Sequence, residues 1–203
     1  MALFKPKTTT PTNFYGACEI SILNYTDKSK EYDWADIYLD VEIKQKGSDY
    51  TKSIRLAGSF EKGPDGSITG GSVLNRLYHF FDIVGIEAGV NAKGEWETAT
   101  GEPIKDIAKY LNDGYVAESN EPKSFPYLAY VYKEQPKQAG GKVYTRVHHK
   151  LNHNSPEGRK RLEEDVKWFK SKGFLKEVKE DSPNAVSQEE LENVFGSDAM
   201  SNM

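Results

Sequence analysis

The sequence predicts a mainly β protein of the α+β class, in which five antiparallel strands form a small barrel around one helix. Two observations predict this class. Apolar and polar residues alternate in three segments of the first 60 residues and in two aromatic-rich segments after residue 123, which is the period of strands. Between these groups lies a segment with the apolar spacing of an amphipathic helix, and a further helical pattern follows the last strand.

Three strands are predicted before the first helix, at residues 14–24, 34–44 and 50–60. The second, WADIYLDVEIK, alternates without a fault over its whole length, and in the third Ile54 and Leu56 are the expected inward pair. The connections are short and polar and have no helical pattern. The three strands are therefore predicted to form an antiparallel meander.

Two helices are predicted after the meander. Residues 72–84 form the first, with Ser72 as its N-cap and Gly85 as its C-terminal stop. The glycine-rich residues 61–71 before it are predicted as a turn, and residues 86–101 as a loop. A shorter helix is expected within residues 102–114.

The chain then returns to strand. SFPYLAYVYKE (124–134) and KVYTRVHHKLNH (142–153) are predicted to pair as a hairpin. A final helix at 156–172 has the clearest signals, because Ser155 is a favourable N-cap and Pro156 suits the first helical position.

The resulting order, three strands, a helix and two strands, is that of the OB fold, a five-stranded antiparallel barrel with a helix between strands 3 and 4. Here a C-terminal helix is added. The same order permits an open antiparallel sheet with helices on one face. The predicted organisation is a flexible N-terminal arm at 1–13, an OB-fold domain at 14–179 and an acidic mobile tail at 180–203.

The distribution of charge, the single cysteine and the lack of long apolar stretches exclude several classes of protein. Residues 176–203 contain seven carboxylates and two lysines, so the net charge of −4 hides a body, residues 1–175, with a net charge of +1. Cys18 is the single cysteine, which excludes an intramolecular disulfide and fits a reducing compartment. No apolar stretch approaches the roughly 18 residues of a membrane span, and the N-terminus lacks an apolar signal core, so neither a membrane partner nor secretion is expected.

The segments FYGACEISILN, WADIYLDVEIK, KSIRLAGSF, VLNRLYHFFDIVGIE and YLAYVYKEQPKQAGGKVYTRVHHKL, in this order, resemble small bacteriophage single-stranded DNA-binding proteins of OB fold. The resemblance covers about residues 14–152 and is one of layout. It implies a cytoplasmic protein, in the host if viral, that is no enzyme, uses no cofactor and coats single-stranded DNA during replication, recombination and repair. It also implies a partner-binding acidic tail. In the best-known proteins of this kind the tail ends in an acidic run closed by Pro-Phe, whereas this tail ends in SDAMSNM. The residues that could take the place of that acidic run, at an earlier position in the tail, are Glu189, Glu190, Glu192 and Phe195.

The segment 142–153 holds three of the four histidines and raises the hypothesis of a metal site. On a strand, however, His149 and His153 lie about 13 Å apart, and the adjacent His148 and His149 point to opposite faces. No metal is therefore predicted. The sequence contains none of the motifs GxSxG, HExxH or GxxxxGK[ST], so no catalytic residue is predicted. One enzymatic alternative, a magnesium site of a nuclease accessory, would use Asp33, Asp36 and Asp40.

Nucleic-acid binding needs aromatic faces that stack on bases and cations that follow the phosphates. One face of strand 142–153 has both kinds of residue: Tyr144, Arg146, His148 and Lys150. Arg55 is expected to project outward near Trp34 and Tyr38, and the flanking loops add Lys28, Lys30, Lys137 and Lys142. We expect Trp34, Tyr38 and Tyr144 to stack on bases, and the cations to neutralise phosphates.

Acidic residues on the second strand are the main observation against this hypothesis, because Asp36, Asp40 and Glu42 would repel phosphate. Ordinary solvated strand faces also account for the same residues. The alternative function is a protein-interaction module that docks on a replication or recombination enzyme. The aromatic strand after Pro126 would also permit a homodimer through strand pairing.

Overall fold

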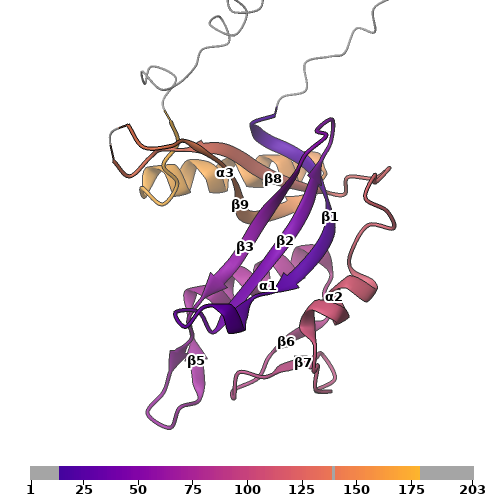
Figure 1. Cartoon of the computed structure of the whole chain (residues 1–203), viewed down its shortest axis with the longest axis vertical. Helices are drawn as coiled ribbons and strands as arrows, with labels where there is room; N and C mark the ends of the chain where they lie inside the picture. Colours follow the sequence, from indigo (N-terminus) through magenta and orange to yellow (C-terminus); the bar gives the residue numbers. More distant parts are fainter. Residues whose placement is uncertain (1–13, 139, 179–203) are drawn as a thin grey trace, which may run out of the picture.

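The computed structural model describes residues 14–138 and 140–178, which form a five-stranded antiparallel sheet with three α-helices and two small hairpins (Figure 1). The elements are β1 (Gly16–Asp27), the 3-10 helix η1 (Ser29–Glu31), β2 (Ile37–Gln45), β3 (Thr51–Gly58), β4 (Glu61–Lys62), β5 (Ile68–Gly70), α1 (Ser72–Val84), β6 (Ala88–Val90), β7 (Trp96–Thr98), α2 (Ile107–Gly114), β8 (Tyr127–Glu134), β9 (Tyr144–His153) and α3 (Pro156–Ser171). None of these described helices is long and apolar enough to cross a membrane.

The predicted arm and tail lie outside the described residues. The same holds for the four tail residues that were expected to bind partners: Glu189, Glu190, Glu192 and Phe195.

The sheet has the strand order β3-β2-β1-β8-β9, and all neighbouring strands are antiparallel. The predicted meander is confirmed, and Asp40 of β2 lies opposite Arg55 of β3. The apolar residues that alternate along β2 are buried, as is the predicted inward pair Ile54 and Leu56. The period of two thus selects the face of the sheet that enters the main core.

Helix α1 packs against that core face with its buried stripe, which includes Leu77, Phe80 and Phe81. Its C-terminal stop at Gly85 is confirmed, since this residue has a φ of 80° and its N–H donates to the carbonyl of Phe81 at 2.8 Å. The N-cap prediction is wrong by one residue. Ser72 is the first helical residue and Gly71, with a φ of 132°, is the N-cap.

Two predicted connections and the start of one predicted helix differ from the structure. The segment 61–71 contains the β4-β5 hairpin, and the segment 86–101 contains the β6-β7 hairpin instead of a loop. Helix α2 begins only at Ile107, where Asp106 accepts a hydrogen bond from the Lys109 N–H at 2.9 Å. The preceding residues are not helical because Pro103 forms a bridge with Glu97 of β7.

Helix α3 packs on the opposite face of the sheet. Leu128 of β8 contacts Leu162 and Val166 of α3, whereas the next residue, Ala129, belongs to the main core. The predicted N-cap is confirmed, since the Ser155 hydroxyl accepts a hydrogen bond from the Gly158 N–H at 3.0 Å. Helices therefore cover both faces of the sheet, not one.

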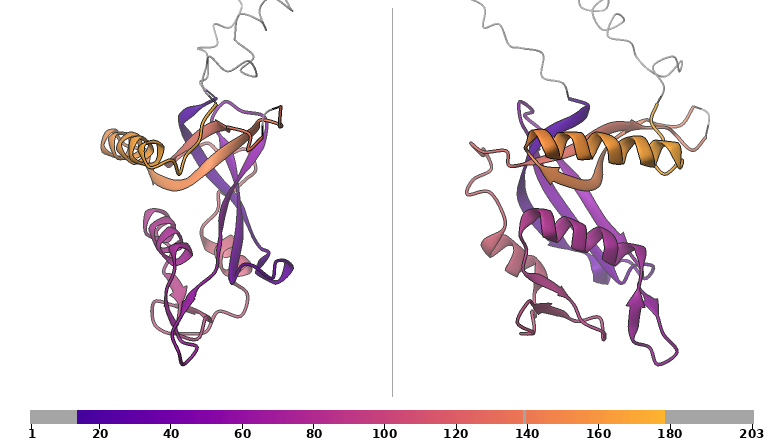
Figure 2. Two further views of the ribbon diagram at one scale, coloured as in Figure 1. Left: turned by 90° about the vertical axis from the view of Figure 1, so that its left-hand side faces the viewer. Right: turned by 180° about the vertical axis from the view of Figure 1, so that it is seen from behind.

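The two edge strands, β3 and β9, run in the same direction and come into contact because the sheet is strongly bent. No hydrogen-bonded ladder joins these two described strands, so the predicted closed barrel is not formed and the sheet is open between them. Helix α1 contacts both edge strands, and β9 passes between α1 and α3 (Figure 2).

Candidate nucleic-acid interface

A groove of about 910 Å³ lies where β3 and β9 approach without pairing. Residues 51–53 and Arg55 line it from β3, and residues 145–149 line it from β9. The remaining lining residues come from the chain before β1, the β2-β3 turn and β8: Phe14, Tyr15, Ser48, Tyr50 and Tyr132. The open edge of the sheet thus becomes a concave strip that combines cations with aromatic rings.

The cations of the groove differ in whether they already make an ion pair or a hydrogen bond within the chain. Arg55 is exposed, and its guanidinium makes no hydrogen bond or ion pair with a described residue. Arg146 forms an ion pair with Glu134 at 2.8 Å. Lys52 donates to the side-chain oxygen of Gln45 at 2.8 Å, and burial lowers its pKa. Arg55 is therefore the cation that is most available to a phosphate.

Large aromatic side chains surround the groove with their rings in solvent. The exposed fractions are 45% for Phe14, 39% for Tyr15, 81% for Tyr50 and 52% for Tyr144. Cations already lie over two of these rings, because Lys133 is 5.2 Å from the centroid of Tyr15 and Arg146 is 5.3 Å from that of Tyr144. Exposed rings on a concave surface provide faces on which bases can stack.

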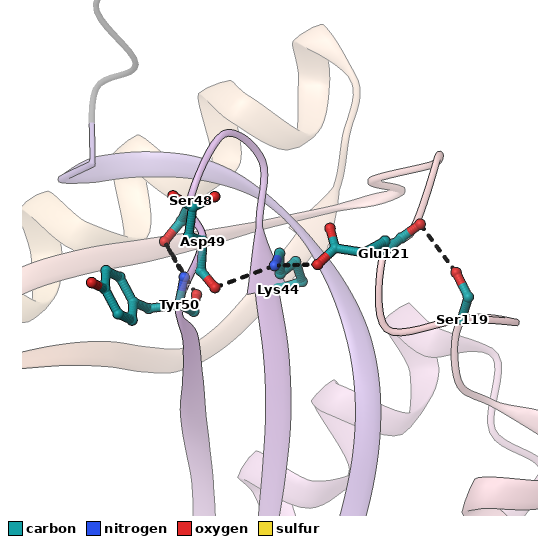
Figure 3. Close-up of polar contacts among 6 residues, drawn as sticks. All are labelled: Lys44, Ser48, Asp49, Tyr50, Ser119 and Glu121. Atoms are coloured by element: carbon teal, nitrogen blue, oxygen red, sulfur yellow. Dashed lines mark hydrogen bonds and ion pairs between the residues drawn. The ribbon is translucent and has the colours of Figure 1, made fainter.

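The turn that carries Tyr50 is held by polar contacts (Figure 3). The Ser48 hydroxyl accepts from the Tyr50 N–H at 3.2 Å and donates to the Tyr50 carbonyl at 3.1 Å. The buried Lys44 ammonium donates to the Asp49 carbonyl at 3.4 Å and pairs with Glu121 at 3.0 Å. The Tyr50 ring points away from this ion pair in Figure 3, so the turn is fixed while the ring stays exposed.

The loop between β1 and β2 carries a second group of aromatic rings. Tyr38 was expected to stack on bases, but it is only 7% exposed because Tyr32 stacks on it with 4.5 Å between ring centroids. Trp34 contacts the same pair and is 58% exposed, so it is the accessible ring with the larger face. Its carbonyl accepts from the Ser59 hydroxyl at 2.6 Å, directly after the end of β3.

Two of the three carboxylates that were expected to repel phosphate, Asp36 and Asp40, are paired within the chain, whereas Glu42 of β2, opposite the groove residue Ser53, makes no ion pair with a described residue. Lys28 pairs with Asp40 at 2.7 Å, and Lys62 pairs with Asp36 at 2.9 Å. Lys28 is therefore not a free cation, and its charge offsets a carboxylate that would repel phosphate. Within residues 14–138 and 140–178, no group of three or more His, Cys, Asp or Glu side chains is placed to hold a metal ion.

The histidines of β9 depart from simple strand alternation. Val131 of β8 pairs with Val147, whereas Ala129 pairs with Leu151, so three residues of β9 lie opposite one residue of β8. This bulge brings the His148 and His149 rings within 4.3 Å of each other, whereas alternation predicted opposite faces.

The bulge also changes the predicted outward face of β9. His148 is 7% exposed and packs against Phe169 of α3, and burial lowers its pKa to about 4, so it cannot serve as a cation at neutral pH. Lys150 pairs with Asp165 of α3 at 3.4 Å and does not line the groove. Of the four residues predicted on that face, Tyr144 and Arg146 remain accessible for binding.

The three other loop lysines are exposed and make no ion pair with a described residue: Lys30 in η1, and Lys137 and Lys142 in the β8-β9 turn. The groove itself brings together Arg55, Arg146 and His148, while Trp34 lies beyond the other end of β3.

No family model, no curated protein and no solved structure matches this chain. The interpretation of the groove therefore depends on its own residues. Sequence reasoning missed the groove residues Phe14, Tyr15, Tyr50 and Lys52. Tyr50 stands at the start of a predicted strand, which was a usable signal for exposure, but only the approach of β9 makes it part of a groove.

Proposed function

We propose that this protein binds single-stranded DNA without strong sequence preference along the groove between β3 and β9, and protects it during replication, recombination or repair. We further propose that the domain is an OB-type barrel that is left open at this seam. The strand order, the approach of the two edge strands and the position of α1 against both support that assignment.

The observation that carries the proposal is the combination, in one groove, of the unpaired Arg55 with exposed aromatic rings. Rings stack on any base, since every base has a π-face, so such a surface is tolerant of sequence. A duplex keeps its bases stacked on each other and offers them no such contact. The chemistry of the groove therefore favours single strands.

A path for the strand follows β3. Tyr50 precedes this strand and Trp34 is attached just beyond its end, with Arg55 between them. Seven residue steps from Thr51 to Gly58 correspond to about 23 Å. The ion pairs of Asp36 and Asp40 reduce the repulsion that phosphates would meet beside this path.

The test is a titration with fluorescently labelled oligo(dT) over a range of salt concentrations. We expect binding at about 50 mM salt that weakens as salt rises, because bound phosphates release counterions. For single strands each lost phosphate contact lowers the slope of log K against log salt by about 0.7, so the double variant Arg55→Ala with Arg146→Ala is expected to lower it by about 1.4. Lys105→Ala removes an exposed charge outside the groove and is the matched control.

Absence of binding at about 50 mM salt would refute the proposal. An unchanged slope in the double variant would show that DNA binds elsewhere on the protein. Equal affinity for duplex and single-stranded DNA would contradict the role of the aromatic rings.

A further inference from the structure

A second exposed aromatic surface lies at the C-terminal end of α3, away from the groove lining. Trp168 is 50% exposed and Phe174 is 71% exposed, and their ring centroids are 5.8 Å apart. The backbone that carries them is fixed, because the Phe174 N–H donates to the Phe169 carbonyl at 2.9 Å and the Lys172 N–H to the Trp168 carbonyl at 3.0 Å. Two adjacent exposed rings on a fixed backbone are typical of a docking surface.

Three lysines that neighbour Trp168 and Phe174 in the chain determine which charge this surface attracts. Lys167, Lys172 and Lys176 are exposed, and none of them pairs with a described residue. Lys170 is the exception, because Glu177 and the Tyr130 hydroxyl occupy its ammonium group. We call Trp168, Phe174 and the three unpaired lysines the α3 patch. A complementary ligand is a peptide with carboxylates around a large apolar side chain.

The chain itself contains such a peptide. Residues 189–195 are EELENVF, in which three glutamates accompany Leu191, Val194 and Phe195 at the i, i+3, i+4 spacing of one helix face. Ser187 and Glu190 have the spacing of a capping box. The segment is therefore suited to dock as a short amphipathic helix.

The position where the described chain ends favours docking within one molecule. The Val178 N–H donates to the Lys133 carbonyl at 3.0 Å, which anchors the chain four residues after Phe174. From Val178 to Glu189 an extended chain reaches up to about 36 Å. A connection of this length gives an effective concentration of the order of 1 mM, so even a weak contact would be substantially occupied.

We propose that residues 189–195 dock on the α3 patch of the same chain, with Phe195 against the rings of Trp168 and Phe174 and the glutamates beside the lysines. The groove, which contains the unpaired Arg55, is the competing acceptor for this acidic segment. The inference does not depend on DNA binding.

Paramagnetic relaxation in the full-length protein tests this contact. A spin label on Ser197→Cys is expected to broaden the indole N–H signal of Trp168 and the amide signal of Phe174. The buried Cys18, whose pKa is raised to about 11, should remain unlabelled under the same conditions. The indole signal of Trp96, which stacks on Phe81 in the main core, is the internal control.

Charge reversal of the α3 patch provides the matched variants. Replacing Lys167, Lys172 and Lys176 by Glu is expected to reduce the broadening at Trp168 to the level at Trp96. Introducing Lys at Glu189, Glu190 and Glu192 in the same chain should restore it. All three lysines are exposed, so these changes do not disturb the core.

The outcomes separate the possible occupants. Broadening at Arg55 and Arg146 instead of at the α3 patch would overturn the proposal in favour of the groove. Broadening that appears when isotope-labelled chains are mixed with separately spin-labelled chains would overturn it in favour of docking between copies. No broadening at any described residue would reject a contact between this segment and the folded domain.

Discussion

Replacement of Tyr50 by alanine tests the groove with the least disturbance of the fold. The ring is 81% exposed, so its removal takes little apolar area out of the core. The contacts of Tyr50 with the Ser48 hydroxyl involve only main-chain atoms, and an alanine retains them. The variant therefore removes an aromatic face and leaves the turn intact.

The expected loss follows from the energy of one stacked base. Stacking on an aromatic side chain contributes about 1–3 kcal/mol per base, so Tyr50→Ala should raise the Kd for oligo(dT) by about 5- to 150-fold. Tyr50→Phe keeps the ring and should bind nearly as well as the wild type. The salt dependence should not change in either variant, since neither removes a charge.

Fluorescence anisotropy of labelled oligo(dT) measures these values, and circular dichroism checks that the variant is folded. Tyr78→Ala is the matched control, because Tyr78 is 43% exposed but lies on α1, outside the groove lining. A folded Tyr50→Ala variant with less than a twofold change in Kd would refute stacking on Tyr50. An equal loss in Tyr78→Ala would refute the location of the site.

Three further predictions concern stability. Burial lowers the pKa of His148 to about 4 and that of the neighbouring His149 to about 3. Between about pH 6.5 and pH 4 the unfolded chain therefore binds protons that the folded chain does not, so the free energy of unfolding should fall as the pH is lowered, by up to about 3 kcal/mol for each histidine. Urea unfolding at several pH values measures this, and His148→Gln should weaken the dependence while His149 retains part of it. Gly158→Ala should lower the melting temperature, although alanine ordinarily stabilises a helix by about 1 kcal/mol, because a Cβ there would collide with the carbonyl oxygen of His153. Ser155→Ala should cost about 1 kcal/mol in urea unfolding through loss of the N-cap of α3.

Each of these has an outcome that would contradict it. Gly114→Ala is the control for Gly158→Ala, because nothing lies within 4 Å of a Cβ at that helical position, and equal melting temperatures for the two variants would contradict the steric argument. An unfolding free energy that stays constant from pH 6.5 to pH 4 would contradict a neutral buried His148. Full stability of Ser155→Ala would mean that another group satisfies the first N–H groups of α3.

The groove could be predicted from the sequence only in part, and its residues show why. Arg55 and Arg146 follow from alternation on strands, which is a local property. His148 does not, because the bulge opposite Tyr130 depends on how β9 pairs with β8. Tyr38 was wrongly expected to be accessible because strand alternation cannot show that Tyr32, six residues earlier, folds back and covers it.

Sequence alone determined the five strands, the inward faces of β2 and β3, the meander, the C-terminal end of α1 and the N-cap of α3, because alternation and capping residues act over a few positions. Only the tertiary structure decided that β3 and β9 approach without pairing, and that Phe14, Tyr15 and Tyr50 meet Arg55 and Arg146 there. These residues are up to 132 positions apart in the chain. Their meeting depends on the bend of the sheet, which brings together strands that are distant in the chain and has no signature in a local pattern.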